Sequence, residues 1–124
     1  MREIKFRYTF KNESNQFIQR IFTLEQIEHG DVYELFVEIG DEYELIARDE
    51  FTGTGLYDKN GKEYYHGDVF EWDGLTYCVE NNFGGFGFYD KNQCWQWLYD
   101  IIRSFQHENE IIGNIHENLE LGEQ

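Results

Sequence analysis

The stretch TGTGLYDKNGKEYYHGDVFEWDG, residues 52–74, decides the fold because it sets turn signals between short apolar runs. Its Asn60-Gly61 pair predicts a two-residue hairpin, since both central positions of a type I′ turn need positive φ. The HGD at 66–68 predicts a tight turn, and the DG at 73–74 predicts another hairpin. Short strands at this spacing favour a small β-barrel. We therefore interpret the polar side chains of this stretch, such as Asp58, as turn chemistry rather than as a reactive site.

Length and composition predict one folded domain. A chain of 124 residues buries roughly two-thirds of its unfolded surface, which is enough for one core. Hydrophobic residues make up 40% of the chain and aromatic residues 19%, so we expect an ordered protein with an aromatic core. Within this domain, residues 1–50 are expected to hold N-terminal strands, a short helix and an acidic hairpin, and residues 51–118 a barrel-like core with a helix.

The charge is strongly negative and unevenly placed. The chain has 25 acidic and 10 basic residues, which gives a formal charge of −15. Acidic residues crowd residues 25–50, where Arg48 is the one Lys or Arg, whereas basic residues gather near the N-terminus. Affinity for nucleic acid depends on Lys and Arg displacing counterions from phosphates, so direct nucleic-acid binding is disfavoured.

The first fifty residues predict strands around one short helix. Residues 3–10 alternate apolar and charged side chains with period two, which is typical of a half-buried strand. After the polar turn at 11–15, Thr23 and Gln26 have the spacing of a capping box ahead of Gly30, which predicts a short helix. The segment 31–50 divides at Gly40-Asp41 into two strand-like runs and is predicted to be a hairpin.

The last forty-five residues predict a hairpin, a helix and a final strand. The glycine-rich segment 81–90 lacks the Lys-Ser/Thr of a phosphate-binding loop, so we interpret it as a twisted hairpin. Residues 92–107 space apolar side chains as a helix does, with Asn92 as N-cap, and this is the one longer helix expected. A strand over residues 110–115 closes the pattern.

The cysteines and the apolar runs restrict the protein class. Cys78 and Cys94 form no C-x-x-C pair, and we interpret both as small core residues. No apolar run reaches the roughly 18 to 20 residues that span a bilayer, and the N-terminal segment has no signal-peptide h-region. We therefore expect a cytoplasmic protein with no membrane partner.

No residue pattern predicts catalysis or a cofactor. Nucleophilic catalysis needs an activated Ser, Cys or Lys beside a base, and neither Ser14 nor Ser104 lies in an elbow motif. His66 and Asp68 are the best candidates for a metal with a second histidine, but no H-x-x-x-H spacing supports a site. We predict no catalytic residue, no metal and no cofactor; a small hydrolase with an acidic pair is the weaker alternative.

Three ordered motifs give a family resemblance. The opening MREIKFR, the central TGLYDKNGKEYYHGDVFEWDG and the closing EIIGNIHENLEL resemble the YopX family of small phage and prophage proteins, and residues 11–50 are left unmatched. Departures occur at residues 8–10, at His66 and at Leu119. The positions that match the family are Gly55, Leu56, Asp58, Gly61, Gly67, Asp68, Gly113, Asn114 and Asn118. The residues interpreted as a structural turn motif are Gly55, Asp58, Asn60, Gly61, Gly67, Asp68, Gly113 and Asn114.

The resemblance implies a fold and an origin but no activity. It implies a mainly β (α+β) protein with an SH3-like β-barrel, added helices and a phage origin, which places the protein in the cytoplasm of a bacterial host. The family has no established biochemical role that could be transferred to these residues.

Two hypotheses for function remain, because the acidic charge has two explanations. The first is an accessory protein whose acidic face binds a basic protein surface, as an inhibitor that mimics nucleic acid. The second is a structural or homo-oligomeric assembly protein, in which sheet edges or an aromatic surface form the contact between copies. A solvated surface that serves only solubility is the alternative to an acidic binding face. The residues expected to bind the partner are Glu34, Glu38, Asp41, Glu42, Glu44, Asp49 and Glu50.

Overall fold

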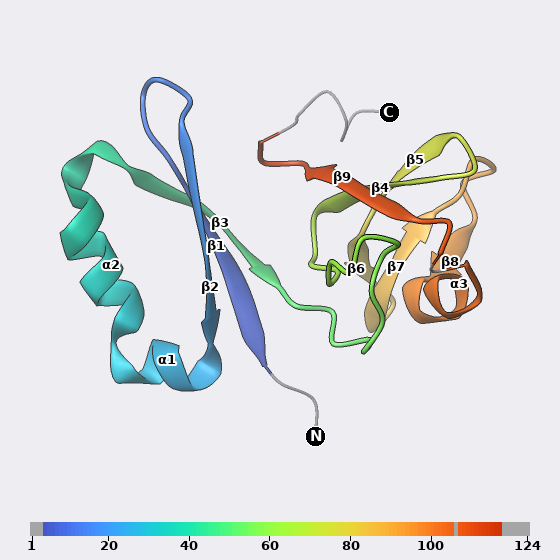
Figure 1. Cartoon of the computed structure of the whole chain (residues 1–124), viewed down its shortest axis with the longest axis horizontal. Coiled ribbons are helices and arrows are strands. Elements are labelled where there is room, and N and C mark those ends of the chain that lie inside the picture. Colours follow the sequence, from blue (N-terminus) through green and yellow to red (C-terminus); the bar gives the residue numbers. More distant parts are fainter. Residues whose placement is uncertain (1–3, 106, 118–124) are drawn as a thin grey trace. The chain divides into compact units, whose positions relative to one another are not determined.

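The computed structural model describes residues 4–105 and 107–117, so the predicted helix position 106 and the motif residues Asn118 and Leu119 lie outside the described residues. The chain divides into two compact units between Phe51 and Thr52. The strands of the described residues form three antiparallel sheets of three strands each (Figure 1). The mainly β class is confirmed. Within the described ranges the sheets do not close into a barrel, and the SH3-like arrangement stays a prediction.

The first unit is a three-stranded sheet, in the order β2-β1-β3, carrying two short helices. The predicted capping box is confirmed, since the Thr23 hydroxyl accepts from Gln26 N–H and the Gln26 side chain accepts from Thr23 N–H. Gly30 then ends the helix in the left-handed conformation at φ 96°. The elements are β1 (Lys5–Lys11), β2 (Phe17–Thr23), α1 (Leu24–His29), α2 (Asp31–Ile39), the 3-10 turn η1 (Gly40–Glu42) and β3 (Glu44–Glu50).

The predicted hairpin over 31–50 is wrong in its first half, where the chain forms the helix α2. Val32, Leu35, Phe36 and Ile39 have the i, i+3, i+4, i+7 spacing of one helix face. This face packs on β1, where Leu35 is buried and the Phe36 ring lies 5.3 Å from that of Phe10, edge to face. The second half forms the expected strand β3.

Strand β1 is buried on both faces at its centre, not half-buried as its alternation predicts. Tyr8 and Phe10 point into the core shared with α2. On the opposite face Thr9 is fully buried, and the Arg7 guanidinium forms a buried ion pair with Asp49 at 3.3 Å. Because β1 is the central strand, its charged side chain is neutralised by a cross-strand partner rather than by water.

Over residues 52–105 and 107–117 the second unit holds two sheets, in the orders β5-β4-β9 and β6-β7-β8, and one helix. Its core is aromatic, as predicted: Tyr64, Phe70 and Phe88 are fully buried, and the Phe70 ring meets the other two rings edge to face. The elements are β4 (Asp68–Trp72), β5 (Leu75–Cys78), β6 (Glu80–Asn82), β7 (Gly85–Tyr89), β8 (Trp95–Trp97), α3 (Leu98–Phe105) and β9 (Glu110–Asn114).

The turns form where predicted, with one difference of type. Asp73 and Gly74 both have positive φ, as a type I′ hairpin requires. At Asn60-Gly61 only the glycine does, and Gly61 N–H donates to the Asp58 carbonyl, so this turn is type I with a left-handed glycine after it. It closes an isolated bridge between Tyr57 and Glu63 rather than a pair of strands.

The predicted helix over 92–107 is also wrong at its start. Residues Trp95–Trp97 form β8 against β7, and α3 covers only Leu98–Phe105. The cause is the Asp90 carboxylate, which accepts from Asn92 N–H and Cys94 N–H and turns the chain back along β7. Asn92 is therefore a turn residue and not an N-cap. Cys94 is exposed at this turn, contrary to its predicted core position, whereas Cys78 is partly buried.

Candidate protein-binding surface

The Asp58 turn is a tertiary anchor as well as a local turn. One carboxylate oxygen of Asp58 accepts from Asn60 N–H at 2.9 Å and Lys62 N–H at 2.8 Å, as the turn interpretation expects. The other accepts from Ile111 N–H at 2.8 Å, at the start of β9. Asp58 is 5% exposed. Its charge therefore fixes backbone on two sides and is not placed for catalysis.

The second turn motif joins the closing motif in the same way. Gly67 N–H donates to the Val79 carbonyl, and the Gly67 carbonyl accepts from Ile115 N–H. The buried Asp68 carboxylate accepts from Tyr65 N–H at 2.8 Å, and Asp68 lies opposite Asn114 in the β4–β9 ladder. In the adjacent ladder position, Gly113 lies opposite Val69. Motifs far apart in sequence thus meet along β4 and β9, and their common role is structural.

The outward face of α2 is the strongest candidate for a binding surface. Opposite the buried Leu35 side of the helix, Tyr33 is 73% exposed and Val37 is 66% exposed. These two side chains lie one helical turn apart, with the exposed Glu34 and Glu38 beside them on the same side. The sequence is interpreted as a strand over these residues, so this arrangement is not predicted. The 3.6-residue spacing of the buried side chains is the signal that indicates the helix and its exposed face.

The acidic surface continues beyond the helix into η1 and the start of β3. Asp41, Glu42 and Glu44 are all exposed. Asp41 and Glu42 face the β1–β2 turn across a hollow of about 530 Å³ that Glu13 also lines. We call this surface the acidic face, and its members are Glu13, Tyr33, Glu34, Val37, Glu38, Asp41, Glu42 and Glu44.

Two of the residues predicted for this surface lie elsewhere. Asp49 is 3% exposed and is bound to Arg7, so it cannot present charge to a partner. Glu50 is exposed, but β3 places it at the opposite end of the strand from Glu44, about 20 Å away at a rise of about 3.4 Å per residue. Sequence proximity grouped these residues, and the direction of β3 separates them.

Carboxylates of the acidic face lie near both ends of α2. Glu34 is in the first turn, where a negative charge favours the helix. Glu38 lies in the last turn of α2, and Asp41 and Glu42 follow directly, although the C-terminal end of a helix dipole favours cations. Glu34 and Glu38 are also a like-charge i, i+4 pair, which is unfavourable by about 0.2–0.5 kcal/mol. Glu38 therefore lowers the stability of α2, whereas Glu34 has a favourable effect at the first turn and an unfavourable one beside Glu38.

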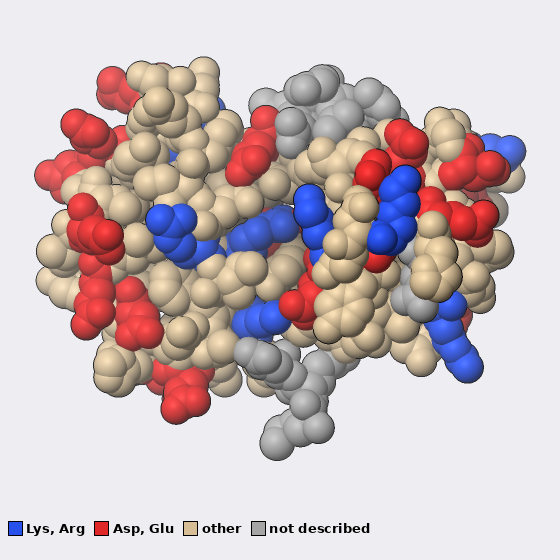
Figure 2. All heavy atoms as spheres, in the orientation of Figure 1, with Lys and Arg blue, Asp and Glu red and all other residues tan. Residues whose placement is uncertain are grey.

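Figure 2 shows how the charges lie on one side of the molecule. Carboxylates form a nearly continuous border over the α1 and α2 side of the first unit. On the second unit the carboxylates visible in this view are interspersed with Lys and Arg. The acidic residues of the first unit are thus gathered, and those on this face of the second unit are mixed with basic residues.

The junction of α1 and α2 carries one ionisable pair. The His29 ring bonds the Asp31 carboxylate at 2.8 Å, and this hydrogen bond raises the pKa of His29 above its ordinary value of 6.5. Asp31 is also in the first turn of α2, where a negative charge stabilises the helix.

Comparison with known proteins identifies the family. The YopX protein model matches residues 2–123, which is nearly the whole chain. The chain belongs to the YopX family. The match also runs through residues 11–50, which the motif resemblance left unmatched, so the acidic face lies within the family domain. No curated protein matches the chain.

Two further findings concern other classes of site. Within the described ranges, no group of three or more His, Cys, Asp or Glu side chains is placed to hold a metal ion. The same ranges contain no helix of sufficient length and hydrophobicity to span a membrane.

Proposed function

We propose that this YopX protein is a non-enzymatic phage or prophage accessory protein that binds a protein partner through its acidic face. The observation that carries the proposal is the exposure of Tyr33 and Val37, at 73% and 66%, among carboxylates on α2. A surface that serves solubility alone needs carboxylates but gains nothing from two exposed apolar side chains between them.

This arrangement matches the anatomy of a protein interface. Binding energy concentrates in a few central residues, tyrosine prominent among them, while a charged rim sets orientation and speeds association. Here Tyr33 and Val37 supply the apolar centre, and Glu34, Glu38 and Asp41 supply the rim. A partner with Lys or Arg around an apolar depression is complementary to both.

The class of partner follows from the charge. Clustered carboxylates present negative potential as a phosphate backbone does, so the acidic face is suited to occupy a nucleic-acid-binding site. We infer that the partner is a basic, nucleic-acid-binding protein of the host or the phage, met in the bacterial cytoplasm, and that the protein inhibits it by mimicry. The SH3-like arrangement that the resemblance implies for the second unit is part of the same proposal, and the second unit takes no part in binding this partner.

The experiment is capture of host proteins on the immobilised chain at about 50 and 200 mM salt, followed by elution with duplex DNA. A steered complex weakens sharply over this salt range. Glu38→Lys/Glu42→Lys should abolish capture, and Tyr33→Ala should weaken it. The matched control Glu71→Lys/Asp100→Lys changes the net charge equally at exposed positions of the second unit and should retain capture.

Three results would count against the proposal. If capture survives the reversal of Glu38 and Glu42, or if the control variant abolishes it equally, the acidic face does not explain the binding. If duplex DNA does not release the captured partner, the DNA and this chain do not compete for one site, and mimicry of nucleic acid is refuted. Sedimentation as a stable oligomer that Tyr33→Ala dissociates would favour the homo-oligomeric assembly role instead.

A further inference from the structure

The sheet β6-β7-β8 carries a second surface, unlike the acidic face in chemistry. Residues directly opposite each other in neighbouring strands share a face of the sheet. Tyr89 lies opposite Trp95, and Gly87 lies opposite both Trp97 and Glu80. One face therefore bears Tyr89, Trp95 and Trp97, while Phe86 and Phe88 point to the other face and into the core.

The aromatic rings on this face form one connected group, which we call the aromatic row: Phe83, Tyr89, Trp95 and Trp97. The Trp95 ring meets those of Phe83, Tyr89 and Trp97 edge to face, with centroids 5.4, 5.1 and 5.7 Å apart. Phe83 is 73% exposed, Trp97 42% and Tyr89 37%. Mutual packing holds these rings in place while most of them remain open to solvent.

Phe83 is present at a cost to the fold. It occupies the β6–β7 turn at φ 57°, in the left-handed region that bulky residues rarely adopt. Glycine or asparagine would fit that position better, and so large an exposed fraction means that Phe83 contributes little to the core. A strained, exposed aromatic residue is better explained by binding than by folding.

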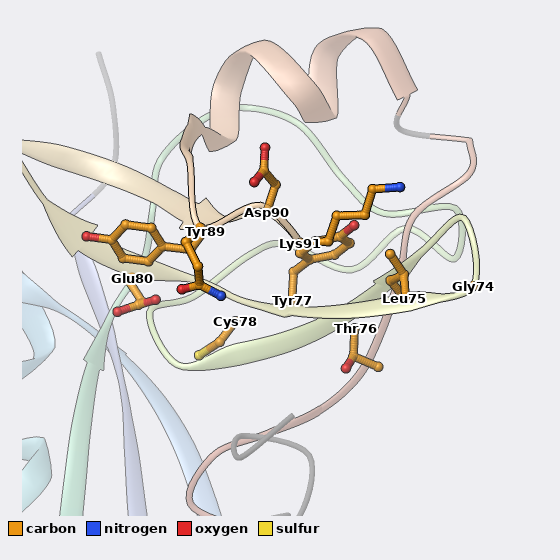
Figure 3. Close-up of a pocket in the computed structure, with 10 residues that line it drawn as sticks. Gly74, Leu75, Thr76, Tyr77, Cys78, Glu80, Tyr89, Asp90 and Lys91 are labelled. Atoms are coloured by element: carbon orange, nitrogen blue, oxygen red, sulfur yellow. The ribbon is translucent and has the colours of Figure 1, made fainter.

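A carboxylate stands beside the row. Figure 3 shows Glu80 next to Tyr89, and both residues line a hollow of about 470 Å³ between β5 and the β7–β8 turn. Two other charged residues, Asp90 and Lys91, line the same hollow. Asp90 is held by the turn: it accepts from Cys94 N–H and Asn92 N–H and from the Gln96 side chain, and these bonds lower its pKa. Glu80 is the better placed carboxylate for a ligand on the row.

We propose that the aromatic row and Glu80 together bind an arginine side chain of an extended segment in a protein partner. A guanidinium stacks on aromatic faces through cation–π attraction and pairs with a carboxylate, and this surface presents both groups. Charge complementarity selects this occupant, because the carboxylates of Glu80 and Asp90 line the hollow beside Tyr89, where they attract a cation and repel a polyanion. Lys91 opposes the cation, so its removal should tighten binding.

This surface lies in the second unit and does not depend on the acidic face. The two can therefore fail separately. A neutral oligosaccharide also stacks on aromatic rows, but it gains nothing from the negative potential, and the experiment separates the two ligands.

The experiment titrates the full-length, ¹⁵N-labelled chain with the peptide acetyl-GGRGRGG-amide, read from the indole N–H signals. The chain has three tryptophans, and Trp72 packs against Phe105 and Tyr77 rather than on the β7–β8 face that carries Trp95 and Trp97, so it is the reference signal. The peptide should shift the signals of Trp95 and Trp97 and leave Trp72 unmoved. The same peptide with citrulline in place of arginine keeps the shape without the charge and should bind about two- to fivefold more weakly.

Variants distinguish binding from folding. Phe83→Gly should lose most of the affinity without lowering the denaturation midpoint, because glycine relieves the left-handed strain. Glu80→Gln should weaken the arginine peptide but not the citrulline peptide, and Lys91→Gln should strengthen the arginine peptide. Glu38→Lys/Glu42→Lys should leave the affinity close to that of the unchanged chain.

The proposal is overturned if the arginine and citrulline peptides bind equally, or if neither shifts the indole signals at millimolar concentration. It is also overturned if maltohexaose shifts them and the peptide does not, which would assign the row to a sugar. Loss of peptide binding in Glu38→Lys/Glu42→Lys would place the peptide on the acidic face instead.

Discussion

Replacing Asp58 by asparagine, and in parallel by alanine, separates the local role of this carboxylate from its tertiary role. Asparagine retains one acceptor oxygen for the Asn60 and Lys62 amides but presents an NH₂ group to the Ile111 amide. Losing one hydrogen bond to a charged group costs about 1.5–3 kcal/mol. Alanine loses all three bonds, which at the lower figure gives about 4–5 kcal/mol.

The assay is urea unfolding at pH 7, followed by tryptophan fluorescence and extrapolated linearly, with amide exchange of Ile111 as a local readout. We expect asparagine to lower the free energy of unfolding by about 2 kcal/mol and to speed exchange at Ile111. A side chain with a purely local turn role would leave asparagine within about 0.5 kcal/mol of the original. A loss this small, together with unchanged protection of the Ile111 amide from exchange, would refute a tertiary link between the Asp58 turn and β9.

Three further outcomes are expected. Asp49→Ala removes the carboxylate partner of the buried Arg7 guanidinium and should cost about 3–5 kcal/mol in urea unfolding; a loss below about 1 kcal/mol would mean that the pair is solvated. Gly87→Ala would drive a Cβ into the Gln96 carbonyl oxygen, so the melting temperature should fall clearly, and an unchanged value would contradict the close approach of β7 and β8. Asp31→Asn should lower the pKa of His29, measured by NMR titration, because Asp31 raises it through a hydrogen bond. Because folding raises the pKa of His29, its contact with Asp31 stabilises the folded protein fully below pH 6.5. This contribution is lost as the pH rises through the pKa of folded His29. If His29 titrates identically in both proteins, the contact is contradicted.

Local chemistry explains which features the sequence predicted well. The capping box at Thr23 and Gln26 needs only four consecutive residues, and the hairpin at Asp73-Gly74 needs only two. Each of these signals is decided by hydrogen bonds and backbone preferences within one turn. Their confirmation required no knowledge of the rest of the chain.

The two elements predicted wrongly, α2 and β8, have side-chain spacings that fit both the two-residue period of a strand and the 3.6-residue period of a helix. In DVYELFVEI, Tyr33, Leu35 and Val37 alternate as in a strand, while Val32, Leu35 and Ile39 are spaced as in a helix. Packing of the helical set on Tyr8 and Phe10 decided the outcome. In the segment that forms β8, the Asp90 turn brought Trp95–Trp97 beside β7, and ladder hydrogen bonds replaced those of a helix.

The sequence by itself determined the turns, the capped helix α1, the aromatic core and the excess of negative charge, because each depends on residue type and near neighbours. Only the tertiary structure decided which carboxylates share a surface. It buried Asp49 against Arg7, carried Glu50 to the far end of β3, and exposed Tyr33 and Val37 beside Glu34 and Glu38. The physical reason is that burial and pairing depend on contacts between residues distant in sequence, which composition and periodicity do not encode.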